Sequence, residues 1–187
     1  MPLDAPNGQD GEGLIGPLNT SKCRLHPNPA PATAPAMSIL RDFPDLPPVW
    51  MLGHAVLAWA AAEWLPLVRF DGSIVQALGL PVAAIGIGLA VWAAVWFARK
   101  RTTIEPRHAP RALIVEGPFR LNRNPIYTGM ALTLLGFALW LGTLSAILVV
   151  LPFPFIIDRR FIRGEERTLR DAFGAEADSY IAGTRRW

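Results

Sequence analysis

The chain has 187 residues, of which 51% are hydrophobic and 18% charged, and its mean hydropathy is positive, whereas soluble domains carry roughly 25% charged residues. The single cysteine, Cys23, excludes a disulfide within one chain and a thiolate metal site. The formal net charge is +3. Seven of the 18 Lys and Arg lie in 99–123 and seven in 159–186, beside long apolar runs, which is typical of a membrane protein. The same distribution argues against a nucleic-acid-binding domain, whose basic stripe would lie on a soluble fold.

Two regions differ in composition along the chain. Residues 1–36 contain seven prolines and show no apolar periodicity. Such a segment cannot bury enough surface to offset its ordering entropy, so it is expected to be a disordered Pro/Ala/Gly-rich tail. Residues 37–187 are expected to form one membrane domain.

Apolar runs predict the membrane spans. About 20 helical residues cross a hydrocarbon core roughly 30 Å thick, and runs at 49–68 and 74–98 have this length. The run 126–157 has 32 residues, too many for one straight span, so two helices over 126–141 and 143–157 are predicted; the alternative is one long tilted helix. The expected fold is an all-α membrane protein with about four transmembrane helices, the last two forming a helical hairpin.

The basic residues orient these spans. Segments 99–125 and 158–187 carry most of the Lys and Arg and are therefore expected on the cytoplasmic side, with both termini. A multi-pass protein of a bacterial inner membrane is the expected setting. Within 158–187, residues 165–181 are predicted to form a cytoplasmic helix, broken near Gly174, with an apolar face toward the membrane domain.

The segment 117–129, GPFRLNRNPIYTG, places charged and rigid residues directly before an apolar run. Asn124-Pro125 disfavours helix at Asn124 and starts one at Pro125. The free N–H groups of that helix, with Arg120 and Arg123 nearby, suit an anion such as a carboxylate or phosphate. The alternative is a basic interfacial loop that contacts lipid headgroups and enforces topology.

Other ionisable residues give weaker signals. Glu165 and Glu166 follow a basic run, and either suits a cation or an amine; an acidic pair in a first helical turn is the alternative. His54 and Glu63 are the ionisable residues within the predicted spans, although their spacing places them on opposite faces of a helix. No metal-ligand spacing, catalytic triad or nucleotide-binding fingerprint occurs.

Two motifs together resemble a known family. Gly117-Pro118-Phe119-Arg120, followed by Arg123-Asn124-Pro125-Ile126-Tyr127 and Gly129, resembles the GPYR…RHPxYxG motif of the isoprenylcysteine carboxyl methyltransferase-like family, which includes phospholipid N-methyltransferase relatives. Its EExxL…FGxxYxxY signature is similar to Glu165-Glu166-x-x-Leu169, Phe173-Gly174 and Tyr180, and Thr103 and Pro106 resemble its approach to the loop.

The resemblance implies an integral membrane methyltransferase that uses S-adenosylmethionine as cofactor and takes a lipophilic small molecule or lipid-modified acceptor. The cofactor would lie in a cytoplasm-facing pocket formed by Gly117, Pro118, Arg120, Arg123, Asn124, Pro125, Tyr127, Gly129, Glu165 and Glu166. Arg123 and Asn124 would bind its carboxylate, and Glu165 or Glu166 its amine.

The resemblance implies a carboxylate or an amine as the methyl acceptor, and methyl transfer would be an in-line displacement in which positioning supplies most of the rate. A carboxylate acceptor would need a cation, for which Arg163 or Arg160 is placed. Asn124 stands where better-known members have His, which argues against proton shuttling there. The alternatives are an NADPH-dependent sterol-reductase-like enzyme and a non-enzymatic protein on the same scaffold.

Overall fold

The computed structural model describes residues 45–99 and 113–187, and these are helical or irregular, without a strand. The expected tail 1–36, together with Thr103 and Pro106, lies outside the described residues. The helices are α2 Pro47–Trp64, α3 Ile74–Ala77, α4 Gly79–Arg99, the 3₁₀ turn η1 Gly117–Arg120, α5 Pro125–Trp140, α6 Leu144–Val150, α7 Phe153–Ile157, the π-turn η2 Asp158–Ile162, α8 Arg163–Phe173 and α9 Ala175–Gly183.

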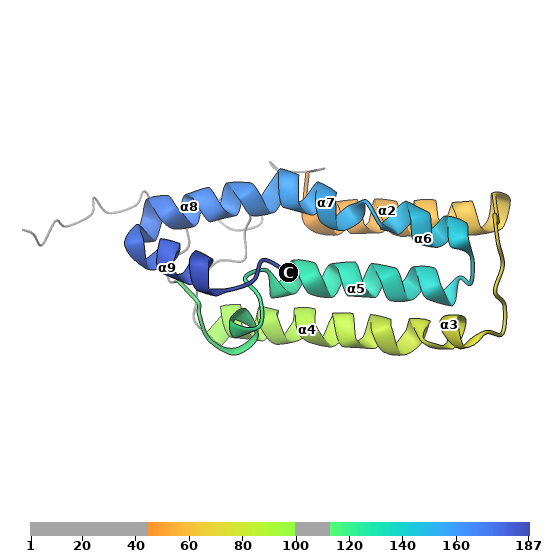
Figure 1. The fold of residues 1–187 in the computed structure, drawn as a ribbon, viewed down its shortest axis with the longest axis horizontal. Coiled ribbons are helices and arrows are strands. Elements are labelled where there is room, and N and C mark those ends of the chain that lie inside the picture. Colours follow the sequence, from red (N-terminus) through yellow and green to blue (C-terminus); the bar gives the residue numbers. More distant parts are fainter. Residues whose placement is uncertain (1–44, 100–112) are drawn as a thin grey trace, which may run out of the picture.

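Helix α5 lies at the centre of the bundle (Figure 1). It packs along α4 on one side and against α2, α6 and α7 on the other, while α8 and α9 extend beyond one end. At the opposite end the chain reverses at 141–143, where Gly142 has a positive φ of 68°. The loop after α2 is tied to this turn, because Phe70 N donates to Gly142 O at 2.9 Å and Leu144 N to Val68 O at 2.9 Å.

Glycines allow α4 and α5 to approach closely. The buried residues of α4 are Gly79, Gly86 and Ala93, spaced seven apart on the face toward α5. A Cβ at Gly86 would lie 2.5 Å from Thr133 N and 2.6 Å from Gly129 O, both backbone atoms. A Cβ at Gly129 would in turn lie 2.5 Å from Gly86 O. Backbone therefore packs on backbone at this crossing, which leaves no room for a side chain.

Helices cover the predicted runs with shifted ends, but among the described residues one helix qualifies as a full membrane span, so the count of four spans stays a prediction. Residues Ile74–Arg99, 26 in number, are long and apolar enough to cross a membrane, and Pro125–Trp140 is a shorter apolar helix. The first helix ends at Trp64, four residues before the predicted end at 68. The predicted helix over 143–157 is interrupted between α6 and α7. Pro152 explains this break, because it lacks an N–H and disfavours helix at Leu151.

The two ionisable residues of the first predicted span take different positions. His54 is buried, donates from Nδ1 to Trp50 O at 2.8 Å and lies edge-on to Phe153 with ring centroids 5.4 Å apart. Glu63 is exposed near the end of α2. Thus His54 is a hydrogen-bonded core residue between α2 and α7, and Glu63 faces outward.

Candidate functional site

The first part of the sequence motif anchors the loop to α4. Gly117 has a positive φ of 60°, and a Cβ there would lie 2.4 Å from the Trp96 ring. Pro118 and Phe119 are buried, and Phe119 packs edge-on against Phe97 with centroids 5.3 Å apart. The side chain of Arg120 is exposed. This 3₁₀ turn therefore sets the path of the chain toward Arg123.

Arg123 is the most constrained cation of the site, with a side chain only 10% exposed. Its Nη1 donates to the carbonyls of Ile181 and Thr184, the latter at 2.7 Å, and its Nη2 donates to Glu166 Oε1 at 3.0 Å. Its Nε is buried and is the one side-chain polar atom of the described residues with neither a hydrogen-bond partner nor access to solvent. A buried donor without a partner is costly, so an acceptor oxygen is expected at this atom.

Asn124 connects the start of α5 to residues 184–187, which we call the strap. Its side-chain amide donates to Arg186 O at 3.0 Å, and the preceding Arg123 N donates to Arg185 O at 2.8 Å. Because the Asn124 side chain is used in this way, it does not cap α5. The first-turn N–H groups of α5 after Pro125 have no intrahelical acceptor by geometry. In Figure 1 the chain end lies beside the start of α5.

Tyr127 and Glu165 form the second link between the starts of α5 and α8. The Tyr127 hydroxyl donates to Glu165 Oε1 at 2.5 Å. Burial raises the pKa of the Glu165 carboxyl above its usual value, the Tyr127 hydrogen bond opposes this, and the neighbouring Glu166 charge adds to it. Among the residues that the structure describes, no arginine or histidine pairs with Glu165. It is therefore the carboxyl group of this site that lacks a cationic partner.

Glu166 is fully engaged by two arginines. Arg186 donates side-on to it, from Nε to Oε1 at 3.0 Å and from Nη2 to Oε2 at 2.6 Å, while Arg123 donates to Oε1. The third nitrogen of Arg186, Nη1, donates to Asp158 Oδ1 at 3.1 Å. Asp158 also accepts from Arg163 Nε at 3.0 Å. The ion pairs raise the pKa of Arg186, chiefly through its hydrogen bonds to Glu166.

A π-turn places Asp158 in this network. Residues Asp158–Ile162 form the wider i→i+5 turn between α7 and α8. Such turns are rare and often occur at functional sites. The wider turn changes the helix register, so that Asp158 and Glu166 both reach the same Arg186 guanidinium.

The predicted site residues thus fall into three groups. Those that meet at the junction of α5 and α8 are Arg123, Asn124, Pro125, Tyr127, Glu165 and Glu166, with Arg163 at the edge through Asp158. Those with packing roles are Gly117, Pro118 and Gly129. Those that lie apart are Arg120, which is exposed, and Arg160, whose Nε donates to Asp45 at 2.6 Å and whose guanidinium lies 4.9 Å from the Trp50 ring centroid.

A comparison with protein families assigns the chain. The model of the phospholipid methyltransferase family matches residues 74–176, more than half of the chain. The chain belongs to the phospholipid methyltransferase family. The matched region includes the first motif and the second as far as Gly174, so the resemblance is confirmed, and it supports a membrane methyltransferase. Comparisons with curated proteins and with solved structures gave no significant match.

Two residues of the ion-pair network, Asp158 and Arg186, are not among the site residues predicted from the sequence. Arg186 was counted in a basic cluster but given no partner, because the carboxylate that it binds lies 20 residues earlier in the sequence. For Asp158 the sequence does offer a sign of an ion pair, because this acid directly precedes two arginines at the end of an apolar run.

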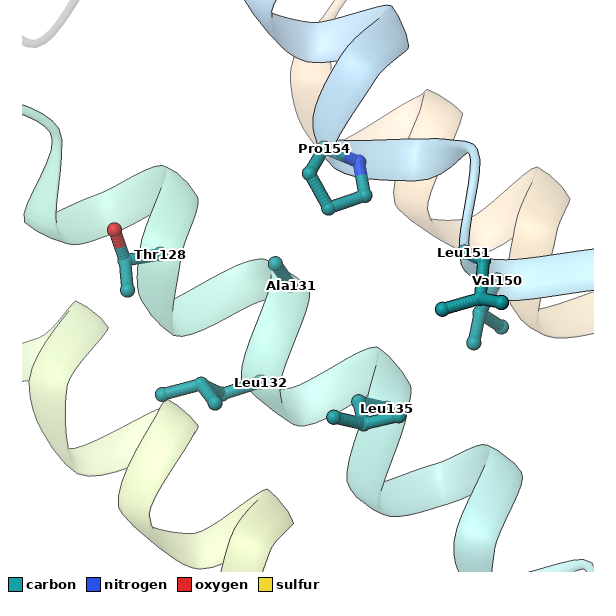
Figure 2. A pocket seen from close by; sticks show the side chains of 7 residues that line it. All are labelled: Thr128, Ala131, Leu132, Leu135, Val150, Leu151 and Pro154. Atoms are coloured by element: carbon teal, nitrogen blue, oxygen red, sulfur yellow. The ribbon is translucent and has the colours of Figure 1, made fainter. Parts of the chain in front are cut away.

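An apolar cavity of about 160 Å³ lies between α5 and the break between α6 and α7 (Figure 2). Its walls come from one face of α5 and from the break between α6 and α7: Thr128, Ala131, Leu132, Leu135, Val150, Leu151 and Pro154. Thr128, which lines the cavity, directly follows Tyr127 in the sequence, although its side chain leaves the helix about 100° around from that of Tyr127. The small side chain of Ala131 and the interruption at Pro152 leave this space between the helices.

Proposed function

We propose that the protein transfers a methyl group from S-adenosylmethionine to a lipophilic acceptor that reaches the site from the membrane. The observation that carries this proposal is the buried Nε of Arg123 without a partner, just before α5, together with Glu165, a carboxyl group without a cation that accepts from Tyr127 in the first turn of the same helix. One donor and one acid, both left open, match a ligand that carries a carboxylate and an ammonium group together.

The residues present fit the amino-acid part of this cofactor. A carboxylate could accept from Arg123 Nε and from the free first-turn N–H groups of α5, whose N-terminus carries partial positive charge. Its ammonium group could bind Glu165, which would thereby gain a cationic partner and ionise more readily. Tyr127 would hold Glu165 in place through its hydroxyl.

The occupancy of Glu166 favours Glu165 as the amine ligand. Arg186 and Arg123 together supply three hydrogen bonds to the Glu166 carboxylate, whose charge is thus already balanced. Replacing Arg186 by an ammonium group would break a bidentate pair, whereas an ammonium at Glu165 would displace no cation.

When bound, S-adenosylmethionine supplies a methyl group on a sulfonium, which a nucleophile attacks in line. The residues of this chain would contribute by holding the cofactor from two sides, Arg123 at the start of α5 and Glu165 at the start of α8. The two elements are joined by the Arg123–Glu166 and Tyr127–Glu165 links, so the donor and the acid are held in place before the ligand binds, whereas the atoms that cover Arg123 Nε would have to move aside. Positioning of this kind, with exclusion of water, accounts for the rate of such displacements.

The cavity beside Thr128 supports an apolar acceptor, because its lining is almost wholly hydrocarbon. The two arginines expected to hold an acceptor carboxylate are both paired, Arg160 with Asp45 and Arg163 with Asp158. With those charges balanced, we favour a lipophilic amine over a carboxylate as the acceptor; the amine would attack in its neutral form, having lost its proton to water, and the sulfur would leave as the neutral thioether. We also propose the four-span topology with both termini in the cytoplasm, for which the 26-residue apolar helix Ile74–Arg99 is the best support.

The test is calorimetric titration of the purified protein in detergent with S-adenosylmethionine and, separately, with NADPH. The wild-type protein should bind S-adenosylmethionine and not NADPH. Glu165→Gln should weaken binding about tenfold or more, the worth of one charged hydrogen bond. Glu63→Gln, an exposed acid on α2, is the matched control and should bind as wild type. Binding of NADPH alone would favour a reductase, and binding of neither would favour a non-enzymatic scaffold.

Arg123→Ala is a poor test of this proposal. Arg123 and Glu166 form a buried ion pair, with side chains 10% and 7% exposed. Removing one partner of such a pair destabilises a protein by about 3–5 kcal/mol. A loss of binding in that variant would therefore report unfolding as well as the lost contact.

A further inference from the structure

Arg186 connects two acids that lie on the same continuous helical segment, before and after the start of α8. Its side-on contact with Glu166 uses Nε and Nη2, and its remaining Nη1 reaches Asp158. The backbone around it is fixed as well, because Asn124 donates to Arg186 O and Arg123 Nη1 to Thr184 O. The strap, residues 184–187, thus holds the guanidinium in one orientation.

The geometry points to a positioning role for Arg186, with Asp158 as its support: we infer that Arg186 keeps the Glu166 carboxylate away from Arg123 Nε, so that this donor stays available to the ligand. This inference rests on the proposed function, in which Arg123 Nε binds the anionic group of the cofactor. Neither Arg186 nor Asp158 needs to touch that cofactor, since both act through Glu166.

The physical reason is competition between two guanidinium groups for one carboxylate. A carboxylate prefers a side-on, two-bond contact with Nε and Nη of one arginine. Arg186 makes that contact, so Glu166 is left with a one-bond contact to Arg123 Nη2. Without Arg186, Glu166 would turn to form the two-bond contact with Arg123, and its Oε would satisfy the Nε atom internally. The donor that the ligand needs would then be occupied.

Asp158 determines which way Arg186 faces. It is buried, 9% exposed, and it accepts from Arg186 Nη1 on one oxygen and from Arg163 Nε on the other. Because the π-turn places this carboxylate on the same side as Glu166, Arg186 is held between two fixed acids. Asp158→Asn keeps the size and shape of the side chain but removes the charge that binds Arg186. It should therefore weaken the affinity for S-adenosylmethionine, as Arg186→Ala does, but by a smaller factor.

The test compares the affinity for S-adenosylmethionine among the wild-type protein, Arg186→Ala, and the double variant Arg186→Ala/Glu166→Gln. Circular dichroism gives the folded fraction of each variant, and affinities are compared on folded protein, because Glu166→Gln removes one charge of the buried Arg123–Glu166 pair. The single variant should bind about tenfold more weakly or worse. The double variant should recover part of the affinity, because glutamine in place of Glu166 is neutral and has one acceptor oxygen in place of two, so it competes for Arg123 Nε less strongly than a carboxylate does. Arg167→Ala, an exposed arginine on α8, is the control and should bind as wild type.

The rescue separates positioning from a general structural role, because a merely structural defect would grow with a second substitution. Turnover should follow the same pattern: the KM for the cofactor rises in Arg186→Ala while kcat at saturating cofactor stays close to that of the wild type. If Arg186→Ala binds normally, or if the double variant binds no better than the single one, the inference is wrong and the proposed function stands. If the wild-type protein does not bind S-adenosylmethionine, both are wrong.

Discussion

Substituting Gly86 by Ala tests the backbone contact that holds α4 against α5. The new Cβ would lie 2.5 Å from Thr133 N and 2.6 Å from Gly129 O, whereas ordinary carbon contacts are about 3.5–4.0 Å. The helices would therefore have to separate by roughly 1 Å. Overpacking of this kind costs about 1–3 kcal/mol, against about 1 kcal/mol gained in helix propensity.

Gly88→Ala is the matched control, because it lies two positions further along α4 and a Cβ there meets nothing within 4 Å. It gains the same helix propensity without the contact, so the two variants differ by the overpacking cost alone. At about 2–4 °C per kcal/mol for a chain of this size, Gly86→Ala should melt about 2–12 °C below Gly88→Ala.

The assay is thermal unfolding of each variant in one detergent, followed by circular dichroism. Gly129→Ala should melt as low as Gly86→Ala, since the two glycines face each other, and its folded fraction should keep its cofactor affinity. Equal melting temperatures for Gly86→Ala and Gly88→Ala would refute the close approach of the two helices. A loss of cofactor affinity in folded Gly129→Ala would show that Gly129 contributes to cofactor binding, as the sequence predicted, and not to helix packing alone.

Three further outcomes follow from the site. Burial raises the pKa of Glu165, so the folded protein holds that proton more tightly than the unfolded chain, and stability should fall as pH rises above the usual glutamate value of about 4.3. Glu165→Gln should lack this decline in melting temperature with rising pH. If melting temperature depends on pH in the same way in Glu165→Gln and in the wild-type protein, the pKa of Glu165 is not raised. Tyr180→Phe removes the 2.9 Å hydrogen bond to the Phe119 carbonyl and should lower the free energy of unfolding, measured with denaturant, by about 1 kcal/mol. Because burial raises the pKa of Tyr180 to about 12, the difference between variant and wild type should persist to roughly pH 10. Ala131→Leu should fill the cavity and raise the acceptor KM without changing cofactor affinity, whereas the exposed Ala84→Leu should change neither.

Local rules predicted the helices and their starts well. Asn124-Pro125 marked the start of α5, because proline suits a first helical turn and disfavours helix before it. Gly174 marked the break between α8 and α9 and adopts a positive φ of 54°. Pro152 separates α6 from α7, a break that the single predicted helix over 143–157 did not include.

The roles of neighbouring residues were beyond such rules. Glu165 and Glu166 are adjacent and chemically alike, yet one accepts from a tyrosine and the other from two arginines. Gly129 lies in the motif but faces α4. Which partner a side chain meets depends on the helix packed against it, and one step along a helix turns a side chain by about 100°.

The sequence by itself determined the class of the protein, with helices from apolar runs and the family from two motifs in order, and it predicted a candidate site with both charge signs at the helix starts. Only the tertiary structure decided which charges neutralise each other and which remain open. The ion pairs of Glu166 with Arg123 and Arg186 join residues 43 and 20 positions apart, so they arise only after α5, α8 and the strap have packed. That packing leaves Arg123 Nε and Glu165 as the open donor and acid, and these two groups are the basis of the proposed cofactor site.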